Sequence, residues 1–136
     1  MRAESVGSCP KDIKHRNAIL AMAVCSTSGV NVLPFGSLDY APTEDFSLMI
    51  KAVKIVKKQI LLKTDNLLSS DAFYEDGRES YKEWSKVGVP CVKMEAAGLY
   101  LVATRHNINA LAILTISDCL VTGNPNTSKE RETTFK

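Results

Sequence analysis

Three short runs of almost uninterrupted apolar residues constrain the fold of this chain more than any other feature. They cover residues 19–25, 89–92 and 110–116. Runs that are apolar throughout are typical of strands buried on both faces of a sheet. Apolar residues at helical spacing separate them and predict helices over residues 45–59, 79–87 and 94–106. We therefore predict an α/β fold with a mainly parallel sheet that is covered on both faces.

The remaining segments are less regular. Residues 26–44 contain two glycines and two prolines and predict a long loop, after which Thr43 or Asp45 can cap the helix over 45–59. Residues 6–9 predict the junction of a strand with a loop. Residues 60–62 form another apolar run, but the segment over 66–74 is too irregular to assign. A capping box of Thr127 with Glu130 predicts the start of a further helix.

Length and charge exclude several classes of protein. The chain has 136 residues, which suits one domain, and 17 basic against 15 acidic residues give a net charge of +2. Its basic cluster, Lys51, Lys54, Lys57 and Lys58, predicts the solvated face of a helix, so nucleic-acid binding is not expected as a main role. No stretch is long enough to span a membrane. The apolar run after the basic segment 11–16 is too short and too far inside the chain for a signal peptide.

The four cysteines, at positions 9, 25, 91 and 119, are scattered without zinc-ligand spacing. We therefore expect no metal site. Free thiols beside apolar runs are typical of a reducing compartment, so a cytoplasmic protein is expected.

Two carboxylates follow predicted strands, Glu95 after the run at 89–92 and Asp118 after the run at 110–116. Burying a carboxylate without a partner costs several kcal/mol, so acids at such places have a partner or a function. Ligands of α/β sheets bind beyond the carboxyl ends of the strands. An aspartate at a strand end can also simply cap a turn, and the two interpretations stay open on spacing alone.

Four segments, taken in order, resemble one enzyme family. They are residues 66–74, residues 94–98 (Met-Glu-Ala-Ala-Gly), the pair Ser117–Asp118 and residues 130–135. Together they closely resemble the hexameric, bacterial-type purine nucleoside phosphorylases, and the likeness extends from Val6 to Phe135. It implies a three-layer α/β/α sandwich around a mixed, largely parallel sheet, incomplete in this chain. It also implies reversible phosphorolysis of purine ribonucleosides and deoxyribonucleosides to the free base and the sugar 1-phosphate, a salvage reaction. It further implies no cofactor beyond inorganic phosphate as co-substrate, a purine nucleoside as the other partner, and a homohexamer in the cytoplasm.

The same resemblance implies which residues contact or protonate the purine base. Asp118 matches the general acid that protonates N7 of the purine, Ser117 its neighbour that orients the acid or the base, and Arg131 the arginine that assists proton transfer. Phe73 matches the aromatic ring that packs on the purine. Composition alone would make Arg131 a solvated helix residue.

Other positions match contacts to the sugar, the pocket wall and phosphate. Glu95 matches the carboxylate that accepts hydrogen bonds from the ribose hydroxyls, and Met94 matches an apolar contact to the sugar, although a core methionine fits its spacing equally well. Val92 and the backbone near Cys9 match walls of the base pocket. Ser8 matches a hydroxyl that contacts phosphate.

The chain also departs from the family pattern. Ser5 stands where the family has a phosphate-binding arginine, Pro10 replaces a glycine, and Lys93 replaces an acid. The family's N-terminal phosphate loop and the end of its C-terminal helix have no counterpart, so we expect residues 1–136 to be a partial phosphorylase domain that folds poorly and forms no hexamer by itself. Two alternatives stay open: an inactive, truncated relative that keeps a nucleoside pocket, and a nucleosidase of the same superfamily.

Overall fold

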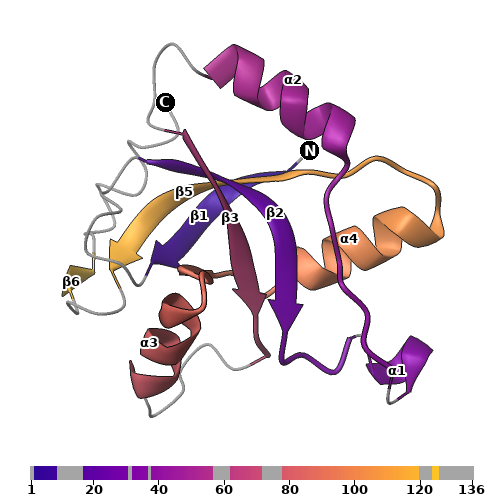
Figure 1. The fold of residues 1–136 in the computed structure, drawn as a ribbon, viewed down its shortest axis with the longest axis horizontal. Coiled ribbons are helices and arrows are strands. Elements are labelled where there is room, and N and C mark those ends of the chain that lie inside the picture. The colour runs from indigo at the N-terminus through magenta and orange to yellow at the C-terminus, as the bar shows by residue number, and fades with distance from the viewer. Residues whose placement is uncertain are drawn as a thin grey trace.

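The computed structural model describes residues 2–8, 17–30, 32–36, 38–56, 62–71, 78–119 and 124–125 (Figure 1). The elements, in chain order, are β1 (Arg2–Ser8), β2 (Ala18–Ser26), α1 (Val32–Phe35), α2 (Phe46–Val56), β3 (Leu62–Ser69), α3 (Arg78–Lys86), β4 (Cys91–Val92), α4 (Ala96–Arg105), β5 (Ala112–Cys119) and β6 (Asn124–Pro125). Strands and helices alternate along most of this order, which confirms the predicted α/β class.

The strands form one mixed sheet in the order β1-β4-β3-β2-β5-β6. Because β1 also pairs with β5, the first five strands close into a ring, which the sequence did not predict. The pairs β1–β5, β2–β3 and β3–β4 are parallel, whereas β1–β4, β2–β5 and β5–β6 are antiparallel. Among the described strands, parallel and antiparallel pairs are thus equally frequent.

Strand β2 changes neighbours along its length. Its first residues, Ala18–Leu20, pair with β5. Beyond Leu20 the same edge is covered by the loop before α2, where the N–H of Val24 donates to the carbonyl of Pro42 at 2.9 Å. At the opposite, carboxyl end of β5, beyond its pairing with β2, β6 pairs with Asp118 and Cys119. The separation of β2 from β5 therefore leaves no continuous open edge along this part of β2.

The predicted strand over 19–25 and the three predicted helices are confirmed, with shifted ends, as β2, α2, α3 and α4. Other predictions need correction. The strand expected over 110–116 extends to Cys119 as β5, so Asp118 lies inside a strand rather than after it. A short helix, α1, interrupts the predicted loop over 26–44. The unassigned segment begins within β3, whose second half is buried. The capping box at Thr127 lies outside the described residues.

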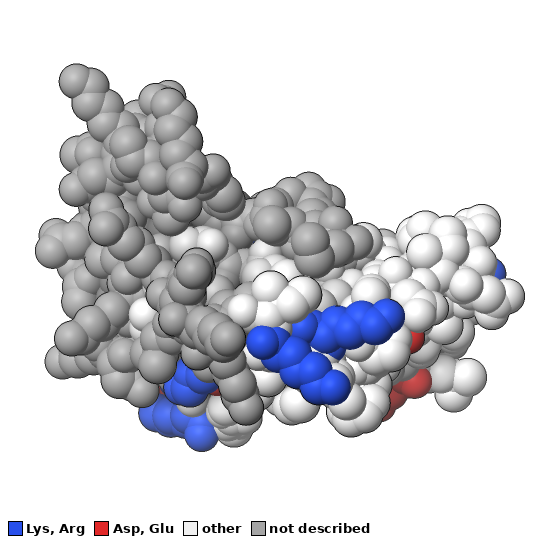
Figure 2. Space-filling model, turned by 90° about the horizontal axis from the view of Figure 1, so that it is seen from above, with Lys and Arg blue, Asp and Glu red and all other residues white. Residues whose placement is uncertain are grey.

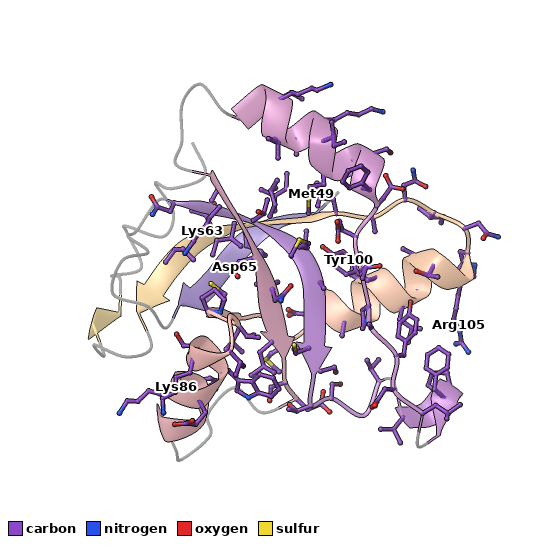
Figure 3. The ribbon with its side chains drawn as sticks, in the orientation of Figure 1. Met49, Lys63, Asp65, Lys86, Tyr100 and Arg105 are labelled. Carbon is purple, nitrogen blue, oxygen red and sulfur yellow. The ribbon has the colours of Figure 1, made fainter. Side chains whose placement is uncertain are left out.

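Three helices pack on different sides of the sheet (Figure 1). The largest apolar cluster lies between α4 and the sheet, around the fully buried Tyr100. A second cluster lies beneath α2, where Met49 and Leu20 belong together and Met49 points from the helix towards the sheet (Figure 3). A third joins α3 to β3 through Tyr81 and Leu68. The described core is therefore distributed around the strands rather than confined to one face.

Helix α2 begins as the sequence predicts. Oδ1 of Asp45 accepts a hydrogen bond of 2.9 Å from the N–H of Leu48 and another from the hydroxyl of Ser47, so Asp45 is the N-cap. Lys51 and Lys54 are exposed on this helix, as predicted for a solvated face. Figure 2 looks down on α2 and shows a few basic side chains among mostly uncharged described residues. Lys57 and Lys58 lie outside the described residues.

Candidate functional site

One row of paired residues crosses the sheet at the carboxyl ends of its strands. Asp118 of β5 pairs with Gly7 of β1, Gly7 with Val92 of β4, Val92 with Leu68 of β3, and Leu68 with Cys25 of β2. Each is the last or next-to-last residue of its strand. Since neighbouring strands lie roughly 4.8 Å apart, the Cα atoms of Asp118 and Val92 are about 10 Å apart. The topology thus brings the predicted acid and a predicted pocket wall to one edge.

The strand that carries Asp118 has an irregularity directly before it. Val6 pairs with Ile116, but Gly7 pairs with Asp118, so Ser117 is an extra residue on β5. Such bulges re-aim the neighbouring side chains and are frequent beside active sites. Ser8, the next residue of β1, pairs with Cys119 and with Cys91. The backbone of Ser8 therefore lies between β4 on one side and the end of β5 that carries Ser117 and Asp118 on the other.

The turn between β4 and α4 carries the other two predicted residues, Met94 and Glu95. The N–H of Lys93 donates to the carbonyl of Leu68 at 2.8 Å, which ties this turn to the row of paired residues. The Glu95 side chain is 49% exposed, and its Oε2 lies 3.2 Å from Nζ of Lys93. Met94 is also partly exposed, so both side chains are available to a ligand and the alternative of a core methionine is not supported.

A pocket of about 630 Å³ adjoins this turn. It is lined by Met94 and Glu95, by Asp71 after β3, by Ser28 after β2, and by the outer surface of α4 at Val102. The carboxyl ends of three parallel strands, β2, β3 and β4, therefore supply its polar rim, as expected for ligand sites in such sheets. The helix supplies an apolar wall.

Asp71 fixes one side of this rim. Its Oδ2 accepts a hydrogen bond of 3.0 Å from the N–H of Gly29. A hydrogen bond from the Ser28 side chain, followed by that from Gly29, lowers the pKa of Asp71, so the group stays ionised. The pocket thus presents two carboxyl groups, those of Asp71 and Glu95, which can accept hydrogen bonds from the hydroxyl groups of a ligand.

Part of the predicted site lies outside what the structure describes. Cys9, Phe73 and Arg131 lie outside the described residues, and for Ser8, Ser117 and Asp118 only the backbone is described. Sequence reasoning missed Ser69 and Asp71, which follow one another closely at the end of β3. The sequence carries a signal for them, because both are polar residues at the end of a strand, in the irregular segment over residues 66–74.

Other kinds of site find no support in the described part of the chain. Its residues contain no group of three or more histidine, cysteine, aspartate or glutamate side chains that could hold a metal ion. Cys91 is buried and Cys25 half-buried, neither forms a disulfide, and burial raises the pKa of Cys25. None of the helices described here has the length and apolar character that crossing a membrane requires.

Comparisons with known proteins show what this chain is similar to. A family model described as "Phosphorylase superfamily" matches residues 1–136. A "Purine nucleoside phosphorylase DeoD-type" of Clostridium novyi (strain NT) is 49% identical over 136 residues, which are 99% of this chain and 58% of the relative. One of the same description from Thermoanaerobacter sp. (strain X514) is 45% identical with the same coverage. The chain thus spans about 58% of the length of these curated relatives.

A solved structure shows the same fold. The structure titled "Structural analysis of P knowlesi homolog of P falciparum PNP" superimposes with a TM-score of 0.80. The match covers 98% of this chain and 56% of that one, at 24% sequence identity. At this identity the likeness establishes the arrangement of the strands and helices.

Proposed function

Because the chain belongs to the phosphorylase superfamily, we propose that it carries the nucleoside-binding part of a purine nucleoside phosphorylase. The observation that carries this proposal is the row of paired residues at the carboxyl ends of the strands, in which Asp118 and Val92 lie on either side of Gly7. The turn that carries Glu95 follows β4 directly. An acid for the base and an acceptor for the sugar then lie at one edge of the sheet. The relatives described as DeoD-type phosphorylases support the choice of a purine nucleoside.

The reaction requires three things of the protein. Phosphate attacks C1′ of the sugar, and the purine leaves with the electron pair of the C1′–N9 bond. The leaving base needs a proton, the sugar needs a fixed pose while positive charge develops, and the phosphate needs hydrogen-bond donors. Asp118 would protonate N7, with Ser117 and Arg131 assisting. Its position in a bulged strand supports a role beyond capping a turn.

The sugar and the base would be held by the remaining residues. Glu95 would accept hydrogen bonds from the ribose hydroxyls while Met94 packs on the sugar. Phe73, Val92 and the backbone near Cys9 would enclose the purine. The exposure of Met94 and Glu95 at a pocket supports this assignment.

Ser8 is the one residue of this chain that the resemblance assigns to phosphate binding. Inorganic phosphate is the proposed co-substrate, with no further cofactor. The proposed setting of the whole enzyme is a cytoplasmic homohexamer, which these 136 residues are not expected to form by themselves. Cys25 and Cys91 form no disulfide, which supports the cytoplasm, and the likeness to hexameric phosphorylases supports the hexamer.

The test measures binding and turnover by the 136-residue chain. Isothermal titration with inosine and with hypoxanthine should show that both bind. We expect little phosphate-dependent release of hypoxanthine from inosine, because Ser5 stands where the family has an arginine and Ser8 alone cannot hold a dianion. Failure to bind either compound would contradict the proposal.

The products separate the alternatives. Phosphate-dependent formation of ribose 1-phosphate would show that the remaining residues suffice for phosphorolysis. Free ribose formed without phosphate would identify a nucleosidase. Binding with no turnover under either condition would show that these residues, taken alone, retain only the pocket.

A further inference from the structure

We infer that Ser69 is a positioning residue, which caps α4 in place of Glu95 and thereby leaves the Glu95 carboxylate free to bind a sugar diol. The inference rests on the proposed function and deepens it, because it names a residue that acts on the sugar through another residue. It is carried by the contacts of Ser69, the residue at the end of β3.

Ser69 is completely buried and joins three segments. Its hydroxyl donates a hydrogen bond of 2.5 Å to the carbonyl oxygen of Met94 and accepts one of 3.4 Å from the N–H of Ala97. Its own carbonyl oxygen accepts a hydrogen bond of 3.0 Å from the N–H of Thr27, just after β2. The hydroxyl therefore binds the turn on both sides of Glu95.

The start of α4 shows why this matters. The first N–H groups of a helix lack partners within the helix, and the side chain of the N-cap residue usually accepts a hydrogen bond from one of them. Here the N-cap is Glu95, with φ −93° and ψ −7°, and its side chain makes no capping hydrogen bond. The N–H of Ala97 donates to the hydroxyl of Ser69 instead. A neighbouring strand thus provides the cap.

The consequence is a carboxylate kept available at the pocket. The Glu95 side chain is half exposed, and Lys93 contacts one of its oxygens. An ionised carboxylate has two acceptor oxygens and suits a vicinal diol. Without the Ser69 hydroxyl, the N–H of Ala97 would lose its partner, and the positive end of the helix would attract the Glu95 carboxylate to itself. The diol would then have to compete with the helix for that carboxylate.

The test compares a nucleoside with its free base. Ser69→Ala should weaken inosine binding about tenfold, the scale of one lost hydrogen bond at a charged group. Hypoxanthine, which has no sugar, should bind as it does to the unaltered chain. Ser85→Ala, at a half-buried serine on α3 away from the pocket, is the matched control and should change neither affinity. Ser69→Cys keeps a weak donor on a slightly larger side chain, so it gives a smaller selective loss if Ser69→Ala does not fold.

Amide hydrogen exchange supplies a readout that needs no ligand. In Ser69→Ala the N–H of Ala97 should exchange faster, and in Ser85→Ala it should not. Unchanged exchange at Ala97 would overturn the inference, and so would an equal loss of inosine and hypoxanthine affinity in a chain that folds. If the unaltered chain binds neither compound, the proposed function itself is wrong and the positioning role is overturned with it.

Discussion

The hydroxyl oxygen of Tyr100, on α4, lies 2.6 Å from the carbonyl oxygen of Ala21 in β2, to which it donates a hydrogen bond. It also accepts a hydrogen bond of 3.1 Å from the N–H of Ala112 in β5. The antiparallel register of β2 and β5, which pairs Leu20 with Ile113, would next pair Ala21 with Ala112. The tyrosine hydroxyl therefore bridges two backbone groups at the point where the strands separate.

Tyr100→Phe should lower the free energy of unfolding by about 1–3 kcal/mol, because it leaves a buried carbonyl and a buried N–H without their partner while keeping the ring. Urea unfolding at neutral pH would measure the loss. Tyr40→Phe is the matched control, since the hydroxyl of Tyr40 makes no hydrogen bond among the described residues and its ring stacks on Phe35. Equal stability of the two variants would contradict a bridging role for Tyr100.

The ionisation of the Tyr100 hydroxyl should affect stability at alkaline pH. Burial is the main cause that raises the pKa of Tyr100 to about 12, against an ordinary value of 10. The unfolded chain loses this proton first as the pH rises, so the contribution of Tyr100 is complete below pH 10 and is lost progressively towards pH 12. Between pH 9 and about 12, the free energy of unfolding should therefore fall less steeply with pH for Tyr100→Phe than for the unaltered chain. The same pH dependence in both chains would show that Tyr100 does not titrate in this way.

The sequence predicted those parts of the fold that depend on neighbours in the chain. The apolar run of β2 and the helical spacing of α2 are local signals, and both elements form where expected. Strand β3 was missed because its first half, with Lys63 and Asp65, is polar and only its second half is buried. Helix α1 was missed because four residues that include a proline carry no periodicity.

The site was predicted in its residue types rather than in its arrangement. Resemblance supplied Asp118, Val92 and Glu95, but the row that joins Asp118 to Val92 through Gly7 requires the pairing of β1 with both β4 and β5. Those strands are distant in sequence, so no local pattern encodes their register. The cap that Ser69 provides is likewise a contact between separate elements.

Acid should weaken the start of α2. The hydrogen bond from Ser47, followed by that from Leu48, lowers the pKa of Asp45, so the folded chain favours the carboxylate. This contribution is present above the ordinary pKa of an aspartate and is lost as the pH falls through the lower value of the folded chain. Asp45→Ala should lower Tm by about 2–5 °C at pH 7 and by less near pH 2. Asp39→Ala, at an exposed aspartate in the preceding loop, is the control, and a pH-independent difference would argue against the cap.

The catalytic assignment of Asp118 can be tested in a chimera in which these 136 residues replace the matching 58% of the Clostridium novyi relative. There, Asp118→Asn should reduce the phosphorolysis of inosine about 10²–10⁴-fold, the usual scale for a lost general acid. The loss should be much smaller for 7-methylinosine, whose base departs without needing a proton at N7.

Asp39→Asn provides the matched control, and it should leave both rates unchanged, because this carboxylate is exposed in the loop before α2. Steady-state rates with both substrates distinguish chemistry from structure. A variant that only distorts the sheet beside Gly7 would bind and cleave both nucleosides less well to the same degree. An equal loss on inosine and 7-methylinosine would therefore identify Asp118 as a structural residue of β5, whereas a selective loss on inosine requires that it deliver a proton to the base.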